Sequence, residues 1–201
     1  MRFFDVLLGR TKPADANLDA LFGLPGAIIT LEAAEAMEPT GEAGVCYKPS
    51  AGQPFVKTTE EFEQLLVLSP GAKVSESSDR YGYNWVVIAD PDFQALVNEV
   101  HVVNSTLEEQ GYGPQLLCSV FGFRTTSPGG AGAARPASGG AATTYLVYLY
   151  KRGAFYPFVP LPGKERRDLE SEMRLQNVLG SELKVEKDKE RWMPLWGVPV
   201  H

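Results

Sequence analysis

Residues that build metal centres and disulfide scaffolds are scarce in this sequence, which has 201 residues but only two cysteines and two histidines. Small secreted domains stabilised by disulfides need many more cysteines, so Cys46 and Cys118 favour a reducing, cytoplasmic compartment. The cysteines lie far from each other and from His101 and His201, and no zinc motif matches their spacing. A metal site would have to combine residues that are distant in the sequence.

Long apolar runs are absent too. The mean hydropathy is -0.15, and no uninterrupted apolar stretch approaches the roughly 20 residues that a membrane-spanning helix needs. The opening segment MRFFDVLLGRTK has a short apolar part and no small-residue cleavage site, so we predict no secretory signal. With 44% hydrophobic residues, the chain can still bury a core of its own.

Positive charge forms no continuous stripe, although basic residues exceed acidic ones at the extreme N-terminus and between Arg124 and Arg152. The net charge is -6, and residues 14–109 contain 16 acidic against 4 basic residues. Residues 164–191 contain 8 of each, which is a balanced pattern rather than a basic stripe. The electrostatic footprint of nucleic-acid binding is therefore missing, and we predict no nucleic-acid partner. The acidic half is compatible with a basic protein partner or with an ordinary solvated surface.

Catalytic and cofactor-binding patterns are equally sparse. The glycine-rich stretch 125–144 lacks the GxxxxGKS/T pattern of a phosphate-binding loop. His101 falls at the flank of an apolar helical stripe, which is typical of a boundary histidine. We therefore predict no catalytic residue, no cofactor and no metal, and a non-enzymatic protein. The alternative is an enzyme of unknown class whose site combines His101 with acids from distant elements.

The first quarter of the chain contains short and partly ambiguous elements. Residues 15–22 predict a short helix that Gly23 and Pro25 end. The run GAIITLEAA that follows fits a strand by its β-branched residues and a helix by its alanines, and both interpretations stay open. AGVCYK predicts a strand from Ala43, and the capping-box spacing of Thr58 predicts the start of another helix.

The best-specified unit is strand, helix, strand. Residues 85–89 are a continuous apolar run of the kind found inside a sheet. Asp90 is the predicted N-cap of the next helix, Pro91 occupies its first position, and Gly111 supplies a left-handed C-terminal cap. Residues 115–123 predict the following strand.

The second half predicts an antiparallel continuation. Residues 125–143 are a glycine- and alanine-rich segment, which we interpret as a flexible loop inserted between the strands 115–123 and 144–150. Pro157 assigns FYPFV to an edge strand or a bulge. A final helix over 164–183 would turn four side chains inward: Leu169, Met173, Leu179 and Leu183. We thus predict one α+β domain over 1–201, with a curved, mainly antiparallel sheet flanked by helices.

The N-terminal segment is a candidate membrane-surface element. Four apolar residues fall on one side of a short helix, with basic residues near its polar side or end: Phe3, Phe4, Leu7 and Leu8. Such a segment can rest on an anionic bilayer, which would make the protein a peripheral sensor on the inner face of the membrane. The alternative is that this face packs on the protein's own core.

The C-terminal tail RWMPLWGVP is a candidate partner-binding element. Its large apolar side chains are of the kind enriched at interface hot spots: Trp192, Met193, Leu195 and Trp196. The same residues could instead attach the C-terminal segment across the sheet. The sequence leaves both alternatives open.

Several motifs taken together resemble a known family. These are the MRFFDVLLGRTKP start, NLDALFGLP followed by AIITLEA, GVCYKP, YGYNWVVIADPDF and the WMPLWG ending. As a set they are similar to the PspA-associated protein family of the PspAB type, which consists of small cytoplasmic proteins linked with the phage-shock, envelope-stress system. The resemblance runs along nearly the whole chain and implies association with a PspA-like coiled-coil protein, but it assigns no chemical role to any residue.

The predicted element order is also similar to the secretion-chaperone-like α+β fold, whose members often dimerise. This likeness is topological and bears only weakly on function. The sequence-based hypothesis is therefore a non-enzymatic cytoplasmic adaptor or chaperone-like protein of the membrane-stress response that acts by protein-protein binding, with a homodimer compatible with the fold.

Overall fold

The computed structural model describes residues 16–48, 64, 71–126, 143–163 and 165–201. Along the chain its elements are η1 Leu18–Gly23, α2 Leu24–Glu35, β1 Met37–Tyr47, β2 Lys73–Ser78, β3 Asn84–Ala89, α4 Phe93–Leu107, η2 Glu108–Tyr112, η3 Gly113–Gln115, β4 Leu116–Thr125, β5 Thr143–Leu149, β6 Ala154–Phe158, α5 Leu169–Leu179 and η4 Lys189–Arg191.

The strands form one six-stranded sheet in the order β2-β3-β1-β4-β5-β6, and every neighbouring pair is antiparallel. The predicted α+β class and antiparallel sheet are confirmed. β1 and β4 lie side by side at the centre, with register irregularities between Pro39 and Ala43 and between Cys46 and Tyr47. β6 is the last strand, so Pro157 sits at the edge of the sheet as predicted.

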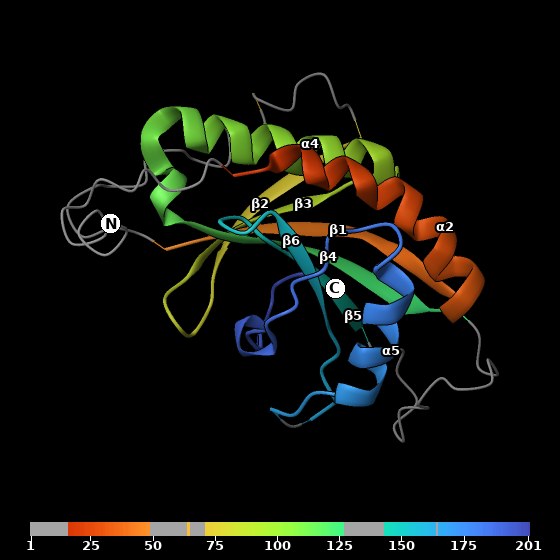
Figure 1. Cartoon of the computed structure of the whole chain (residues 1–201). Coiled ribbons are helices and arrows are strands. Elements are labelled where there is room, and N and C mark those ends of the chain that lie inside the picture. The colour runs from red at the N-terminus through yellow and green to blue at the C-terminus, as the bar shows by residue number, and fades with distance from the viewer. Residues whose placement is uncertain (1–15, 49–63, 65–70, 127–142, 164) are drawn as a thin grey trace, which may run out of the picture.

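Helices cover one face of the sheet. Figure 1 shows α2 and α4 lying next to each other across this face, with α5 beside them near the β6 end. A large apolar core fills the space between helices and sheet, and α4 contributes a buried stripe consisting of Leu96, Val97, Val100, Val103 and Leu107. This is the helical face that the spacing predicts.

The C-terminal segment covers the opposite face. It runs below the sheet in Figure 1, and a second apolar cluster lies between it and the strands. Val200 packs over two strand glycines, Gly44 and Gly122. A Cβ atom added at Gly44 would lie 3.0 Å from Val200 Cγ2, so the close approach of the segment depends on the absence of a side chain there.

The GAIITLEAA run is helical. It belongs to α2. The predicted short helix is η1, which ends at Gly23 as expected, but Pro25 does not stop the helical path, because it occupies the first turn of α2. Proline lacks the N–H that would be unsatisfied in a first turn and has a fixed φ suited to it, so it starts the helix here instead of ending one.

The N-cap of α4 is Asp92, not Asp90 as predicted. The Asp92 carboxylate accepts hydrogen bonds from the backbone N–H groups of Gln94 and Ala95, at 2.9 and 3.2 Å. Asp90 is buried and accepts instead from the Asp92 N–H at 2.7 Å. Pro91 therefore precedes the cap. Gly111 has a φ of 87°, which agrees with its predicted left-handed conformation.

The helix α5 is shorter than predicted, and its inward face is different. Leu179 and Leu183 are buried, but Leu169 is 63% and Met173 47% exposed. The buried face carries Glu172 in their place, because an arginine from the preceding loop pairs with its carboxylate. The apolar pattern alone could not indicate this.

Several predicted features lie outside the described residues. These are the helix starting at Thr58, most of the glycine- and alanine-rich segment, and the apolar N-terminal segment. Within the described ranges, no helix combines the length and apolar character needed to cross a bilayer.

Candidate functional site

A cavity of about 480 Å³ lies on the face of the sheet that the C-terminal segment covers. Most of its lining is apolar or aromatic, and it comprises Cys46, Asp79, Tyr81, Tyr83, Trp85, Leu117, Cys118, Leu149, Tyr156, Met193, Pro194, Leu195, Trp196 and Val198. A concave, mainly apolar site with a few polar groups is the usual form of a binding site.

The floor of the cavity is a row of side chains that crosses four strands. Trp85 on β3 pairs with Cys46 on β1, Cys46 pairs with Cys118 on β4, and Cys118 pairs with Leu149 on β5. Residues directly opposite one another in antiparallel strands point to the same face of a sheet. The register therefore brings two free cysteines together between a tryptophan and a leucine.

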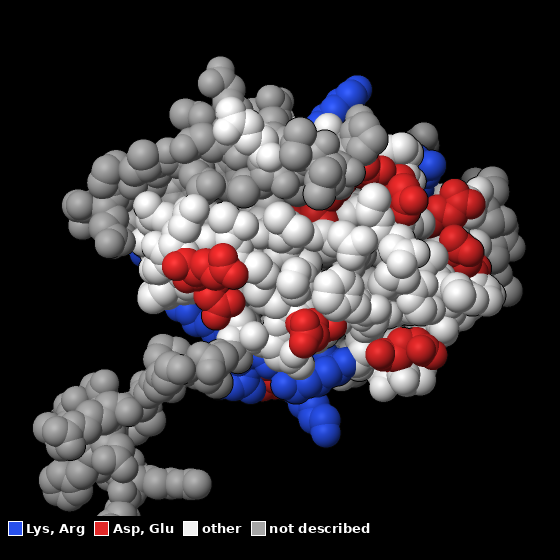
Figure 2. All heavy atoms as spheres, turned by 90° about the horizontal axis from the view of Figure 1, so that it is seen from above, with Lys and Arg blue, Asp and Glu red and all other residues white. Residues whose placement is uncertain are grey.

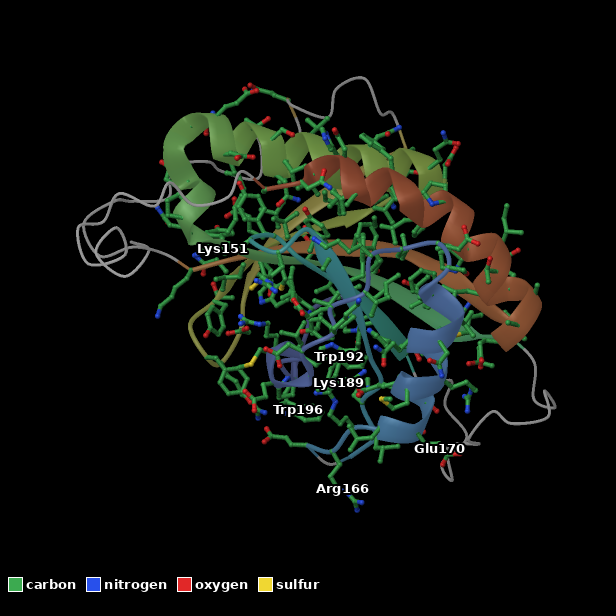
Figure 3. All side chains as sticks on the ribbon, viewed as in Figure 1. Lys151, Arg166, Glu170, Lys189, Trp192 and Trp196 are labelled. Atoms are coloured by element: carbon green, nitrogen blue, oxygen red, sulfur yellow. The ribbon has the colours of Figure 1, made fainter. Side chains whose placement is uncertain are left out.

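The C-terminal segment forms one side of the cavity and is held by side-chain hydrogen bonds. The Tyr156 hydroxyl donates to the Met193 carbonyl oxygen at 2.8 Å, and the indole N–H of Trp192 donates to the Glu186 carbonyl oxygen at 2.9 Å. Lys189 Nζ lies 3.4 Å from the centroid of the Trp192 ring. Figure 3 shows Lys189, Trp192 and Trp196 close together below the sheet.

The β2–β3 hairpin contributes the polar wall. The Asp79 carboxylate accepts from the backbone N–H groups of Tyr81 and Tyr83, at 2.9 and 3.0 Å, and from the Trp85 indole N–H at 3.1 Å. Three donors thus hold this carboxylate in place within the hairpin. At the hairpin tip, Arg80 forms an ion pair with Glu165 of the loop before α5.

The two thiols interact directly. A side-chain hydrogen bond to Cys118, followed by burial, raises the pKa of the Cys46 thiol well above its usual range. Cys46 is therefore a protonated thiol at neutral pH, which is a weaker nucleophile than a thiolate. From the sequence, the two cysteines indicated a reducing compartment and no local zinc motif. Their pairing escaped sequence reasoning because strand register, which no local spacing encodes, brings them together.

The structure separates the four predicted partner-binding residues. Trp192 is 5% exposed and belongs to the second apolar cluster, whereas Met193 is 57% exposed at the cavity rim. Leu195 and Trp196 are partly buried and line the cavity. The tail thus packs across the sheet, and Met193 is the most exposed of the four predicted residues.

His101 lies away from this cavity, on α4. Its ring stacks on Phe22 with centroids 4.8 Å apart, its Nδ1 is 3.4 Å from the Ser105 hydroxyl, and its Nε2 is 3.8 Å from an Asp19 carboxylate oxygen. The ring is partly buried, as expected for a histidine at the boundary of a helical stripe. It is not among the residues that line the cavity.

Acidic side chains are distributed over the face of the molecule that carries the helices. Figure 2 shows this face from above, with Asp and Glu spread across it and Lys and Arg mainly along one border. Exposed members on its elements include Asp19, Glu32 and Glu109. The predicted membrane-surface residues Phe3, Phe4, Leu7 and Leu8 lie outside the described residues, so their role stays a prediction.

Comparison with known families agrees with the resemblance in the sequence motifs. A model of the family PspAB, PspA associated protein B, matches residues 1–200, and the chain belongs to this family. Neither a curated protein nor a solved structure matches the chain. Membership implies association with the PspA stress system.

Proposed function

We propose that this protein is a non-enzymatic adaptor of the PspA-associated stress system, and that its cavity binds apolar side chains on a helix of a PspA-type coiled-coil partner. The observation that carries the proposal is the cavity of about 480 Å³ with its mainly apolar and aromatic lining. An amphipathic helix binding to an apolar groove is a common mode of protein recognition.

The cavity and its rim would both contribute to binding. Full burial of a leucine or phenylalanine side chain contributes roughly 1.5–3 kcal/mol. Because association costs roughly 4–15 kcal/mol, anchors inside the cavity must be supplemented by contacts around it. The rim offers further apolar contact, since Met193 is 57% and Tyr81 51% exposed. Methionine is flexible and polarisable, and it adapts to partner side chains of different shapes.

The polar groups of the cavity support a binding role over catalysis. The carboxylate of Asp79 is engaged by three donors of its own hairpin. The Cys46 thiol, with its raised pKa, is protonated, and the Tyr156 hydroxyl donates to a backbone carbonyl. These groups stabilise the cavity walls, and none of them has the arrangement of a general base next to a nucleophile.

The arrangement of elements also supports a chaperone-like mode of action. An antiparallel sheet carries helices on one face and a binding cavity on the other. The apolar face of a partner helix bound in this cavity would be shielded from water until the coiled-coil protein assembles. This is the behaviour expected of a chaperone.

A charge at the cavity rim tests the proposal. Met193→Glu places a carboxylate at an exposed position on the cavity rim. Met173→Glu is the matched control, because Met173 is 47% exposed on α5. We expect Met193→Glu to weaken binding of the purified PspA-type protein from the same host about tenfold or more, because the carboxylate must be desolvated at the interface. Met173→Glu should bind like the unmodified protein.

Isothermal titration calorimetry of both variants provides the measurement, with melting temperatures confirming that both are folded. Equal affinity of the two variants, or no binding by the unmodified protein, would contradict the proposal that the cavity binds the partner helix. Trp196→Ala is a second probe of the same surface, since its ring lines the cavity and is partly buried.

A further inference from the structure

The two thiols on the cavity floor lie at directly paired strand positions, which is one geometric requirement of a disulfide. Cys46 and Cys118 are direct partners in the antiparallel pairing of β1 and β4. Direct partners in such a pair have Cα atoms about 4.5–5.5 Å apart, which lies within the roughly 4.4–6.8 Å range of disulfides. Both side chains point to the cavity face of the sheet, because direct partners in an antiparallel pair share a face and both thiols line the cavity.

Both thiols are also reachable from one place. Each is free and almost fully buried by the protein, yet each lines the cavity. Trp85 and Leu149 flank the pair on the cavity floor. A bulky, charged oxidant such as glutathione disulfide does not match this apolar lining, whereas an uncharged hydroperoxide with an apolar substituent does.

We propose that Cys46 and Cys118 are a hydroperoxide-reactive dithiol that closes to a cross-strand disulfide when an apolar organic hydroperoxide enters the cavity. This modification site goes beyond partner binding and does not depend on it. Cys118 is the attacking residue and Cys46 the resolving residue.

The reaction balances without a further reactant. The Cys118 sulfur, on losing its proton, attacks the terminal peroxide oxygen; the O–O bond breaks, the proton passes to the departing alkoxide, and an alcohol and a sulfenic acid form. The Cys46 sulfur then attacks the sulfenic sulfur, and its proton leaves with the hydroxide as water. Two thiols and one hydroperoxide become one disulfide, one alcohol and one water.

The roles follow from the exposure of the two thiols. Cys118 is 6% exposed and Cys46 2%, so a hydroperoxide in the cavity reaches Cys118 first. The raised pKa of Cys46 agrees with this order, because the more firmly protonated thiol is the poorer first nucleophile. Cys46 then lies next to the sulfenic acid that it must attack.

The test uses the isolated full-length protein, reduced and freed of reductant, with cumene hydroperoxide as the probe. We expect both thiols to disappear, the intact mass to fall by that of two hydrogen atoms, the protein to stay monomeric on a non-reducing gel, and dithiothreitol to restore both thiols. Oxidation by cumene hydroperoxide should be faster than by glutathione disulfide at equal concentration.

Single variants separate the roles. Alanine replaces a buried cysteine without adding a polar group, and near-ultraviolet circular dichroism checks that the variants fold. In Cys46→Ala, the sulfenic acid on Cys118 should be trapped by dimedone, whereas Cys118→Ala should form no adduct at Cys46. The proposal is overturned if both thiols of the unmodified protein survive conditions that fully oxidise free N-acetylcysteine, or if the only disulfide formed links two chains.

Discussion

Arg167 connects the C-terminal segment to α5 through a single side chain. Its Nη1 donates to the Trp192 carbonyl oxygen at 2.6 Å, and its Nε donates to both carboxylate oxygens of Glu172 at 2.8 Å. Glu172 is completely buried and also accepts from the Val159 N–H at 2.9 Å. Burial raises the pKa of Glu172, while Arg167 and the Val159 N–H oppose that rise.

Removal of Arg167 should therefore be strongly destabilising. Arg167→Met leaves the Glu172 carboxylate buried without its cation, which typically costs about 3–5 kcal/mol of unfolding free energy. Urea unfolding followed by circular dichroism measures this loss. Adding Glu172→Gln should recover much of it, because the amide carries no charge. If Arg167→Met alone loses less than about 1 kcal/mol of unfolding free energy, Arg167 does not neutralise Glu172 as described.

The two tryptophans of the tail should respond differently to truncation. Trp192 is 5% exposed, stacks on Tyr156 with centroids 5.7 Å apart and donates from its indole, so Trp192→Ala should lose about 3–5 kcal/mol. Trp196 is only partly buried, and Trp196→Ala should lose clearly less. Parallel urea unfolding curves give both values, and equal losses would refute the assignment of Trp192 to the core.

Asp92, rather than Asp90, should behave as the helix cap. Asp92→Ala removes the acceptor for two N–H groups at the start of α4 and should cost about 1 kcal/mol. The control is Glu109→Ala at an exposed position beyond the other end of the helix, where a change within about 0.5 kcal/mol is expected. Chemical denaturation of the two variants decides the matter.

Alkaline pH should weaken the fold through Tyr148. Burial, followed by the negative charges of Glu108 and Asp19, raises its pKa to about 12. An unfolded tyrosine ionises near pH 10, so between about pH 10 and pH 12 the unfolded state loses protons that the folded state keeps. The free energy of unfolding therefore falls as pH rises through this range and is fully retained below it.

The Tyr148→Phe variant isolates this contribution. At neutral pH it loses the hydrogen bond to the Asn17 carbonyl oxygen, which is worth about 1 kcal/mol. Above pH 10 its stability should decline less steeply than that of the unmodified protein, with a residual slope from Tyr145 and other buried tyrosines. Identical slopes in denaturant titrations at increasing pH would contradict the assignment.

Local patterns predicted the central elements well. The apolar run at residues 85–89 lies within β3, and the helical stripe that follows is the buried face of α4. Both signals are contained in short stretches of sequence, because burial on one face imposes its own period. The strand around residues 115–123 and the edge position of Pro157 have the same local origin.

The predictions that failed concern residues whose partners are distant in the sequence. Glu172 occupies a buried helical position because Arg167 neutralises it, so the apolar pattern placed Leu169 and Met173 wrongly. Similarly, the cavity arises only when register aligns Cys46 with Cys118 and the tail crosses the same face. Such contacts form only in the assembled sheet, and the local pattern of apolar and polar residues does not predict them.

The C-terminal segment is attached to its face of the sheet differently from the helices on the opposite face. Beyond Trp192, the segment attaches through bonds that involve side chains: Tyr156 to the Met193 carbonyl, Tyr145 to the Val200 carbonyl, and Glu42 to the His201 N–H. An extended segment anchored at separate points can detach in a sub-global opening that costs less than complete unfolding. Amide hydrogen exchange along the tail would then outpace exchange in β1 and β4, and each opening would briefly expose an apolar sheet surface much wider than the resting cavity.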